Sequence, residues 1–234
     1  MDDTRQRIVA AAAAILAEKG RDCVTTRAVS AKAGVQDPAI YRLFGDKRGL
    51  LDAVTVYGFE QYMKDKAALP VTDDPVENLR AGWDLHIQFG LANPALYSLI
   101  YGDPRPGATS PAAEVAIAVL HQHIHDIAAA GLLSISEERA AQLVHAAGSG
   151  TTLALLAQPE SQRDMAASTL AREAVIAAIT TDKKARETSD VTVAAIALRA
   201  NLTETSALTT TESALMRDWL DRVIAENHHR KDSR

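Results

Sequence analysis

The chain has 234 residues, of which 47% are hydrophobic and only 4% aromatic, and its formal net charge is -5. This length allows two packed units, and an apolar content rich in alanine and leucine favours helices packed on helices over sheets, so we expect an all-α protein. No apolar run is long enough to span a bilayer, and the acidic start at Asp2 and Asp3 does not fit a secretory signal, so we expect a cytoplasmic protein with no membrane partner.

The charge is unevenly divided along the chain. Residues 1–52 hold nine Lys and Arg against seven Asp and Glu, a net charge of +2, whereas residues 53–234 hold sixteen against twenty-three, a net charge of -7. A basic head on an acidic body is compatible with a small DNA footprint, because affinity for DNA depends on the few cations that meet phosphates.

The first helix is expected between Thr4, a candidate cap, and Gly20, because Ile8, Ala12 and Ile15 recur at helical spacing. The single cysteine, Cys23, cannot form an internal disulfide, and we expect it to be a small buried hydrophobe rather than a nucleophile.

A helix-turn-helix is expected next. Thr25 can cap a second short helix that stops at Gly34, and a third short helix follows with Pro38 in its first turn. Two short helices joined by a glycine turn form this motif, which spans about residues 25–44. Asp46 then caps a longer helix that runs to about Lys66.

The rest of the chain is also expected to be helical, with breaks at proline and glycine. Ser134 with Glu137 forms a candidate capping box, and Ser161 opens a later helix. The expected helices cover about residues 75–92, 94–101, 111–130, 135–158, 161–181, 191–202 and 212–225. We therefore divide the chain into a DNA-binding domain at 1–52, a helical dimerisation and effector-binding domain at 53–227 and a solvated tail at 228–234.

The third helix has the size and polarity of a helix presented to a DNA major groove. Gln36, Asp37, Ala39 and Arg42 take its polar positions, whereas Ile40 and either Leu43 or Phe44 face inward. Two interpretations of Tyr41 stay open: its hydroxyl can donate to a DNA phosphate, or its ring can belong to the core.

Lys47 and Arg48 stand in the first turn of the fourth helix, where cations oppose the helix dipole. A DNA phosphate at that terminus would turn this unfavourable placement into a favourable one, since it would meet both Lys47 and the free backbone amides. The alternative is an ordinary solvated pair of cations.

This stretch resembles the tetracycline-repressor (TetR) family of transcriptional regulators over about fifty residues. The resemblance is carried by Thr25, Thr26, Arg27, Ala33, Gly34, Val35, Pro38, Ile40, Tyr41, Phe44, Asp46, Lys47, Leu50 and Leu51. It implies that bases or phosphates are contacted by Thr26, Arg27, Asp37, Pro38, Ala39, Tyr41, Arg42 and Lys47. With Thr25 and Gln36, which flank the two short helices, these form the expected DNA-binding set.

Two residues depart from the family pattern. Leu43 stands where many members have histidine or another aromatic residue, and Asp37 stands where an amide or neutral residue is usual. An aspartate repels phosphates unless it accepts a hydrogen bond from a cytosine amino group. The operator sequence therefore cannot be copied from a relative.

For the body of the chain, the resemblance implies a homodimer that binds a palindromic double-stranded operator and encloses a small hydrophobic effector. The segments 139–157 and 191–202 are apolar enough to form a four-helix bundle across a two-fold axis. The candidates for the effector pocket are large side chains in the middle of this domain, most of which combine an apolar ring with a polar atom. They are Trp83, His86, Phe89, Tyr97, Tyr101 and His145.

Other chemistry is not indicated. His121 and His125 have the spacing of two zinc ligands, but no third ligand is evident nearby, so we expect surface histidines, no metal site and no cofactor. No Ser/His/Asp or Cys/His grouping supports an enzyme. The leading hypothesis is a repressor that an effector releases from DNA. The alternatives are a regulator without a small-molecule effector and an all-helical enzyme or carrier.

Overall fold

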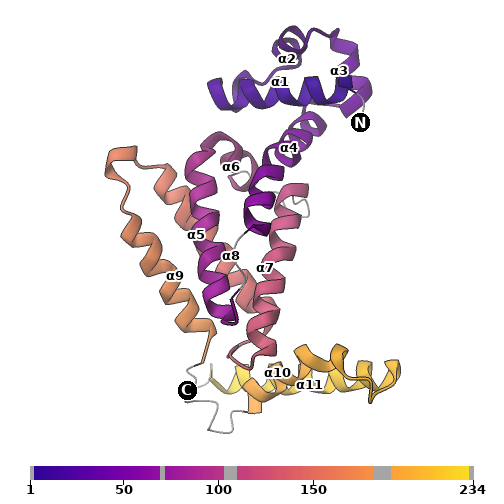
Figure 1. The fold of residues 1–234 in the computed structure, drawn as a ribbon, viewed down its shortest axis with the longest axis vertical. Helices are drawn as coiled ribbons and strands as arrows, with labels where there is room; N and C mark the ends of the chain where they lie inside the picture. Colours follow the sequence, from indigo (N-terminus) through magenta and orange to yellow (C-terminus); the bar gives the residue numbers. More distant parts are fainter. Residues whose placement is uncertain (1–2, 69–71, 103–109, 182–190, 232–234) are drawn as a thin grey trace. The chain divides into compact units, whose positions relative to one another are not determined.

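A computed structural model describes residues 3–68, 72–102, 110–181 and 191–231, and the regular elements within these ranges are all helices (Figure 1). The prediction of an all-helical fold is therefore confirmed. The chain divides into two compact units, each built from three segments. The first unit comprises Met1–Pro70, Asp84–Ala116 and Thr151–Arg163, and the second comprises Val71–Trp83, Ile117–Gly150 and Asp164–Arg234.

The first unit begins with four helices: α1 (Asp3–Lys19), α2 (Thr26–Ala33), α3 (Asp37–Phe44) and α4 (Lys47–Ala67). The short 3-10 turn η1 (Arg21–Cys23) links α1 to α2. Because α1 already starts at Asp3, Thr4 lies inside the helix and is not its cap, contrary to expectation.

The predicted start and stop signals of α2, α3 and α4 are confirmed. The side chain of Thr25 accepts a hydrogen bond from the amide of Ala28 at 3.1 Å, and Gly34 ends α2 at a φ of 65°, which favours glycine. Pro38 lies in the first turn of α3. The carboxylate of Asp46 accepts from the amide of Gly49 at 2.8 Å at the start of α4.

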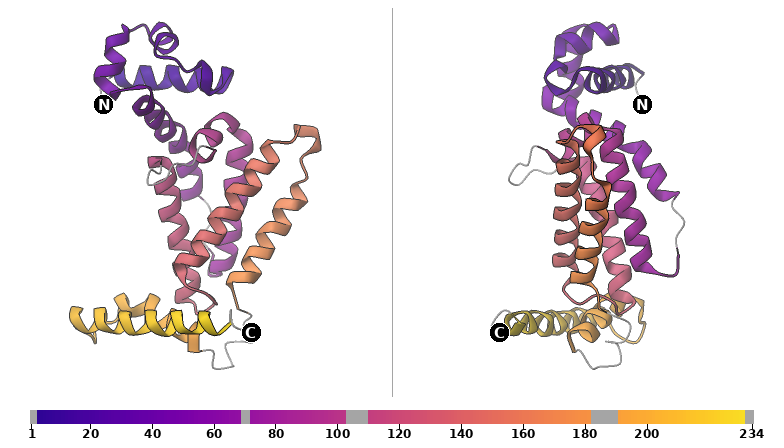
Figure 2. Two further views of the ribbon diagram at one scale, coloured as in Figure 1. Left: turned by 180° about the vertical axis from the view of Figure 1, so that it is seen from behind. Right: turned by 90° about the vertical axis from the view of Figure 1, so that its left-hand side faces the viewer.

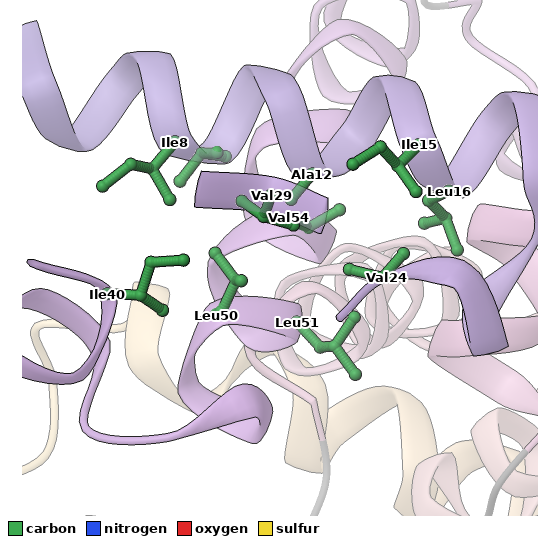
Figure 3. Close-up of a cluster of buried hydrophobic side chains, with 11 residues drawn as sticks. Ile8, Ala12, Ile15, Leu16, Val24, Val29, Ile40, Leu50, Leu51 and Val54 are labelled. Carbon is green, nitrogen blue, oxygen red and sulfur yellow. The ribbon is translucent and has the colours of Figure 1, made fainter. Parts of the chain in front are cut away.

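These helices enclose a cluster that we call the aliphatic core (Figure 3). α1 packs against α2 and α4, and α3 packs against α4. The core consists of Ile8, Val9, Ala12, Ile15, Leu16, Val24, Val29, Ile40, Leu50, Leu51 and Val54. Full burial of one such larger side chain contributes about 1.5–3 kcal/mol, so this cluster is sufficient to hold two short helices in place.

The first unit continues through parts of α5 (Pro75–Ala92), α7 (Pro111–Ala129) and α8 (Glu137–Leu156), with α6 (Pro94–Tyr101) and η2 (Glu160–Gln162) complete. α6 packs against both α1 and α4. Its residues Ala95, Leu96 and Leu99 cover the aliphatic core from outside.

The second unit holds α9 (Met165–Ile179), α10 (Val191–Asn201), the 3-10 turn η4 (Leu202–Glu204) and α11 (Thr210–Lys231), besides parts of α5, α7 and α8. α10 and α11 lie side by side (Figure 2). This hairpin is tied to the start of α8, since the guanidinium of Arg199 pairs with Glu137 at 3.4 Å and with Glu138 at 3.3 Å.

Two predicted helix caps in the later part of the chain are wrong. The backbone amide of Ser134 donates to the carbonyl of Ile179 at 2.8 Å, beside an antiparallel bridge, so α8 begins later and Ser136 precedes its first residue. Ser161 lies in η2, and Asp164 caps α9 by accepting from the amide of Ala166 at 2.9 Å.

The last helix also runs further than expected, because α11 ends at Lys231, within the predicted tail. The expected loop at 103–107, the break at Leu69 and Pro70, and most of the linker at 181–190 lie outside the described residues. None of the described helices combines the length and the apolarity needed to cross a membrane.

Candidate functional site

The expected DNA-binding residues gather on α2, on α3 and at the start of α4. Most of their side chains are exposed, and those of Thr26 and Ala39 are half-buried. The exposed ones are Thr25, Arg27, Gln36, Asp37, Pro38, Tyr41, Arg42 and Lys47. A single compact scaffold thus presents two short helices whose polar side chains meet solvent.

The two faces of α3 are sharply different. Ile40 is completely buried in the aliphatic core, whereas the neighbouring Tyr41 has 54% of its surface exposed. This exposure rules out the interpretation of Tyr41 as a core aromatic. Leu43 and Phe44 are both half-buried, and the guanidinium of Arg5 lies over the ring of Phe44, 5.1 Å from its centroid.

The N-terminus of α4 combines exposed cations with backbone donors. Asp46 accepts from the amide of Gly49 through its carboxylate and from the amide of Leu50, at 3.2 Å, through its carbonyl. The amides of Lys47 and Arg48 are left without a partner inside the helix, as is usual for the first turn. Both side chains are exposed.

The cations of this surface are not neutralised by neighbours. Lys32 pairs with Glu18 at 3.3 Å, but no acidic side chain of the described residues forms an ion pair with Arg27, Arg42 or Lys47. These three cations are therefore available to an anionic partner.

Four of the six candidate pocket residues lie together in the first unit, where α5 meets α6. The imidazole Nε2 of His86 and the hydroxyl of Tyr97 are hydrogen-bonded at 2.8 Å. The ring centroids of Tyr97 and Tyr101 lie 4.6 Å apart, and those of Phe89 and Tyr97 lie 6.3 Å apart.

Two aromatic residues of α4 that the sequence analysis did not assign to a pocket complete this group. The ring centroids of Tyr62 and Phe89 lie 4.5 Å apart, and those of Phe59 and Tyr62 lie 4.8 Å apart. The spacing of Phe59 and Tyr62, three residues apart on one helix face, is the signal that could have found them. We call the whole group the aromatic cluster: Phe59, Tyr62, His86, Phe89, Tyr97 and Tyr101.

Burial makes ionisation of the tyrosine hydroxyls in this cluster still less favourable. Desolvation raises the pKa of Tyr62, Tyr97 and Tyr101 well above the ordinary value for tyrosine; a hydrogen bond with Thr152 acts in the opposite direction on Tyr97. No side chain of the cluster is a carboxylate, a lysine or an arginine. Its chemistry suits a neutral ligand with hydrogen-bonding groups.

The other two pocket candidates lie in the second unit. The indole of Trp83 is buried and donates to the hydroxyl of Ser168 at 3.1 Å, which is an interaction within the core of that unit. Desolvation lowers the pKa of His145.

The remaining residues considered as metal ligands or as a nucleophile are His121, His125 and Cys23. His125 Nδ1 lies 3.2 Å from a carboxylate oxygen of Glu137, and His121 is exposed. Within the described residues, no cluster of histidine, cysteine, aspartate or glutamate could hold a metal ion. Cys23 is exposed rather than buried, so that prediction is wrong; Val24 takes the buried position next to it, because the turn η1 points Cys23 outward.

Comparison with known proteins gives a family match for the first part of the chain. Residues 8–54 match the model of "Bacterial regulatory proteins, tetR family", a segment that includes the aliphatic core and the exposed face of α3. No curated protein matches the chain.

Solved structures extend the likeness to most of the fold. A TetR-family transcription regulator from Shewanella sp. PV-4 is 17% identical, with a TM-score of 0.61, over 76% of this chain and 99% of that chain. A protein of unknown function from Rhodococcus sp. RHA1 is 23% identical, with a TM-score of 0.63, over 77% and 97%. A TetR variant from Acinetobacter baumannii AYE, solved with minocycline, is 24% identical, with a TM-score of 0.55, over 76% and 96%.

Proposed function

We propose that the chain is a DNA-binding transcriptional regulator of the TetR family, and that it acts as a homodimeric repressor which a small-molecule effector releases from a palindromic operator. The observation that carries this proposal is the outer face of α3, where Tyr41 is exposed while the adjacent Ile40 is locked into the aliphatic core. A rigid scaffold that presents a short polar helix is what reading a major groove requires.

The residues of this surface take two roles in the proposal. Arg27, at the start of α2, and Arg42, on α3, reach base edges or phosphates with guanidinium groups that no described carboxylate neutralises. Lys47 and the hydroxyl of Tyr41 hold phosphates and position the protein without reading sequence. A phosphate at the start of α4 also meets the two free amides of that helix.

The proposed dimer uses a second copy of the chain against α8 and α9. On α9 the exposed side chains include Leu170, which is 72% exposed, and the small Ala166, Ala174 and Ala177. On α8, Leu143 is 47% exposed. The segment 191–202, which the sequence suggested as the second bundle helix, already buries its apolar face against α11 in the same chain, so we assign the role to α9.

Sedimentation of two matched variants tests this interface. Leu170→Glu on α9 should produce monomers, because a charge would be buried between the copies. Leu198→Glu, at a 44% exposed position on α10, should leave the dimer intact. A monomer from Leu198→Glu together with a dimer from Leu170→Glu would move the interface to α10.

The aromatic cluster is the proposed effector site. Its neutral hydroxyls and the imidazole of His86 lie within an apolar group, the combination that fixes the orientation of a small hydrophobic ligand. The minocycline bound to the Acinetobacter protein is consistent with a multi-ring effector in this fold. Ligand at a hundred times its dissociation constant should stabilise the chain by about 2.7 kcal/mol in a thermal-shift screen. A ligand that binds tightly without changing DNA affinity would remove the sensor role and leave the regulator.

A footprint on the DNA around its own and neighbouring genes tests the central proposal. Two identical reading helices should protect a palindrome whose half-sites are about 34–36 Å apart, one helical turn. A single asymmetric half-site, or no specific protection, would contradict a homodimeric repressor. Adding the effector should weaken the footprint by a coupling of about 1–3 kcal/mol.

A further inference from the structure

A cleft opens in the first unit between α1, α4 and the turn from α5 into α6. Its volume is about 260 Å3, and residues 92–96 line it together with residues of α1 and α4. None of the six residues of the aromatic cluster lines it. The cleft is therefore lined by α1 and α4, which also form the aliphatic core, and it shares no residue with the proposed effector site.

The space exists because the walls are made of small side chains. At Gly58, α4 comes so near α6 that an added Cβ would lie 2.6 Å from Cδ2 of Leu96. Four of the other lining residues have side chains no longer than a methyl group: Ala13, Ala17, Ala92 and Ala95.

The lining defines the chemistry of an occupant. No lining residue carries a charge, and only Tyr57 and Asn93 offer hydrogen-bonding side chains. A charged ligand would meet no opposite charge among the lining residues, so the cleft favours a neutral molecule. A cavity of about 150 Å3 is enough for benzene, so this larger space has room for two fused rings.

We propose that this cleft is a second small-molecule site, which takes a neutral two-ring aromatic molecule carrying one hydroxyl or carbonyl group. The rings lie against the alanines and Leu96, and the polar group faces Tyr57 or Asn93. The site goes beyond the proposed effector function, because its occupant contacts α1, which contributes no residue to the aromatic cluster.

The experiment titrates the full-length, DNA-free protein with 2-naphthol. A ligand of this size should bind with a dissociation constant of about 0.1 mM. The anion 2-naphthoate has the same rings and should bind at least about tenfold more weakly, because the cleft offers no cation. Equal binding of the two compounds would overturn the assignment of a neutral ligand.

Matched substitutions on α1 locate the bound molecule. Ala17→Phe adds a ring at an exposed position that lines the cleft, whereas Ala10→Phe adds the same ring at an exposed position outside it. Ala17→Phe should weaken 2-naphthol binding by about tenfold or more, and Ala10→Phe should leave it within about twofold. Ala92→Leu, which fills the cleft from α5, should act like Ala17→Phe and covers the case in which one variant fails to fold.

Unchanged binding in both Ala17→Phe and Ala92→Leu, with melting temperatures like that of the parent protein, would overturn the site, as would no detectable binding of 2-naphthol by the parent. Because the measurement uses no DNA, its result is independent of whether the proposed operator binding is found.

Discussion

The aliphatic core and the aromatic cluster belong to the same unit, and α4 contributes to both. The two regions nevertheless bury different kinds of side chain. Among the buried residues of the aliphatic core there is no aromatic or polar side chain. The aromatic cluster instead encloses the hydroxyls of Tyr62 and Tyr97 and the hydrogen bond between Tyr97 and His86.

This difference corresponds to two ways of using a buried region. An aliphatic core has no directional groups, so it serves as a scaffold, and recognition falls to the exposed side chains outside it. A buried hydroxyl is directional, because leaving it unsatisfied costs about 1–3 kcal/mol, so it restricts which groups can lie beside it. We therefore expect substitutions in the two regions to affect different properties.

The strongest test of the aliphatic core as a scaffold is Ile40→Ala. Removal of this fully buried side chain should lower the free energy of unfolding by about 2–5 kcal/mol, and DNA affinity should fall with it because α3 loses its support. Urea unfolding followed by circular dichroism measures the change. Leu43→Ala, at a half-buried position on the same helix, should cost clearly less; equal losses would contradict this role of the core.

Arg27→Ala tests whether the exposed side chains around the aliphatic core recognise DNA. If Arg27 forks onto a guanine, its loss should cost about 1–3 kcal/mol on the specific site and relax the preference at one base pair in each half-site. The unfolding midpoint should not move, because the side chain is exposed. Binding selection on randomised half-sites would measure this change in base preference. An unchanged preference would mean that Arg27 does not read a base.

Lys47→Ala sharpens the distinction between positioning and reading. It should weaken binding to all sequences alike and reduce the slope of log affinity against log salt by about one unit per lost phosphate contact in each subunit. Lys19→Ala, at an exposed lysine at the end of α1, is the matched control and should leave the slope unchanged. Normal salt dependence in Lys47→Ala would mean that no phosphate binds at the start of α4.

The smallest expected effects come from a pair of identical substitutions in the two regions. Tyr97→Phe removes the hydroxyl bonded to His86 and should lower the free energy of unfolding by about 0.5–1.5 kcal/mol, with DNA affinity nearly unchanged. Tyr41→Phe should weaken DNA binding and leave stability within about 0.5 kcal/mol. If both variants changed the same property, the separation of scaffold, surface and cluster would be wrong.

Helix ends show where reading the sequence succeeds and where it fails. The caps at Thr25 and Asp46 were predicted, since each carboxylate or hydroxyl meets an amide only three residues away. The cap predicted at Ser134 failed because the amide of that residue bonds to the carbonyl of Ile179, a partner from another part of the chain.

The sequence by itself determined the all-helical class, the helix-turn-helix and its family resemblance, because these depend on signals within one or two turns, such as Gly34 and Pro38. Only the tertiary structure decided that Tyr41 is exposed, that Cys23 lies outside the core and that Tyr62 joins the aromatic cluster. Each of these depends on which face of a helix is covered by residues distant in the chain. Local periodicity marks an apolar position, but it does not say which partner will fill the space against it.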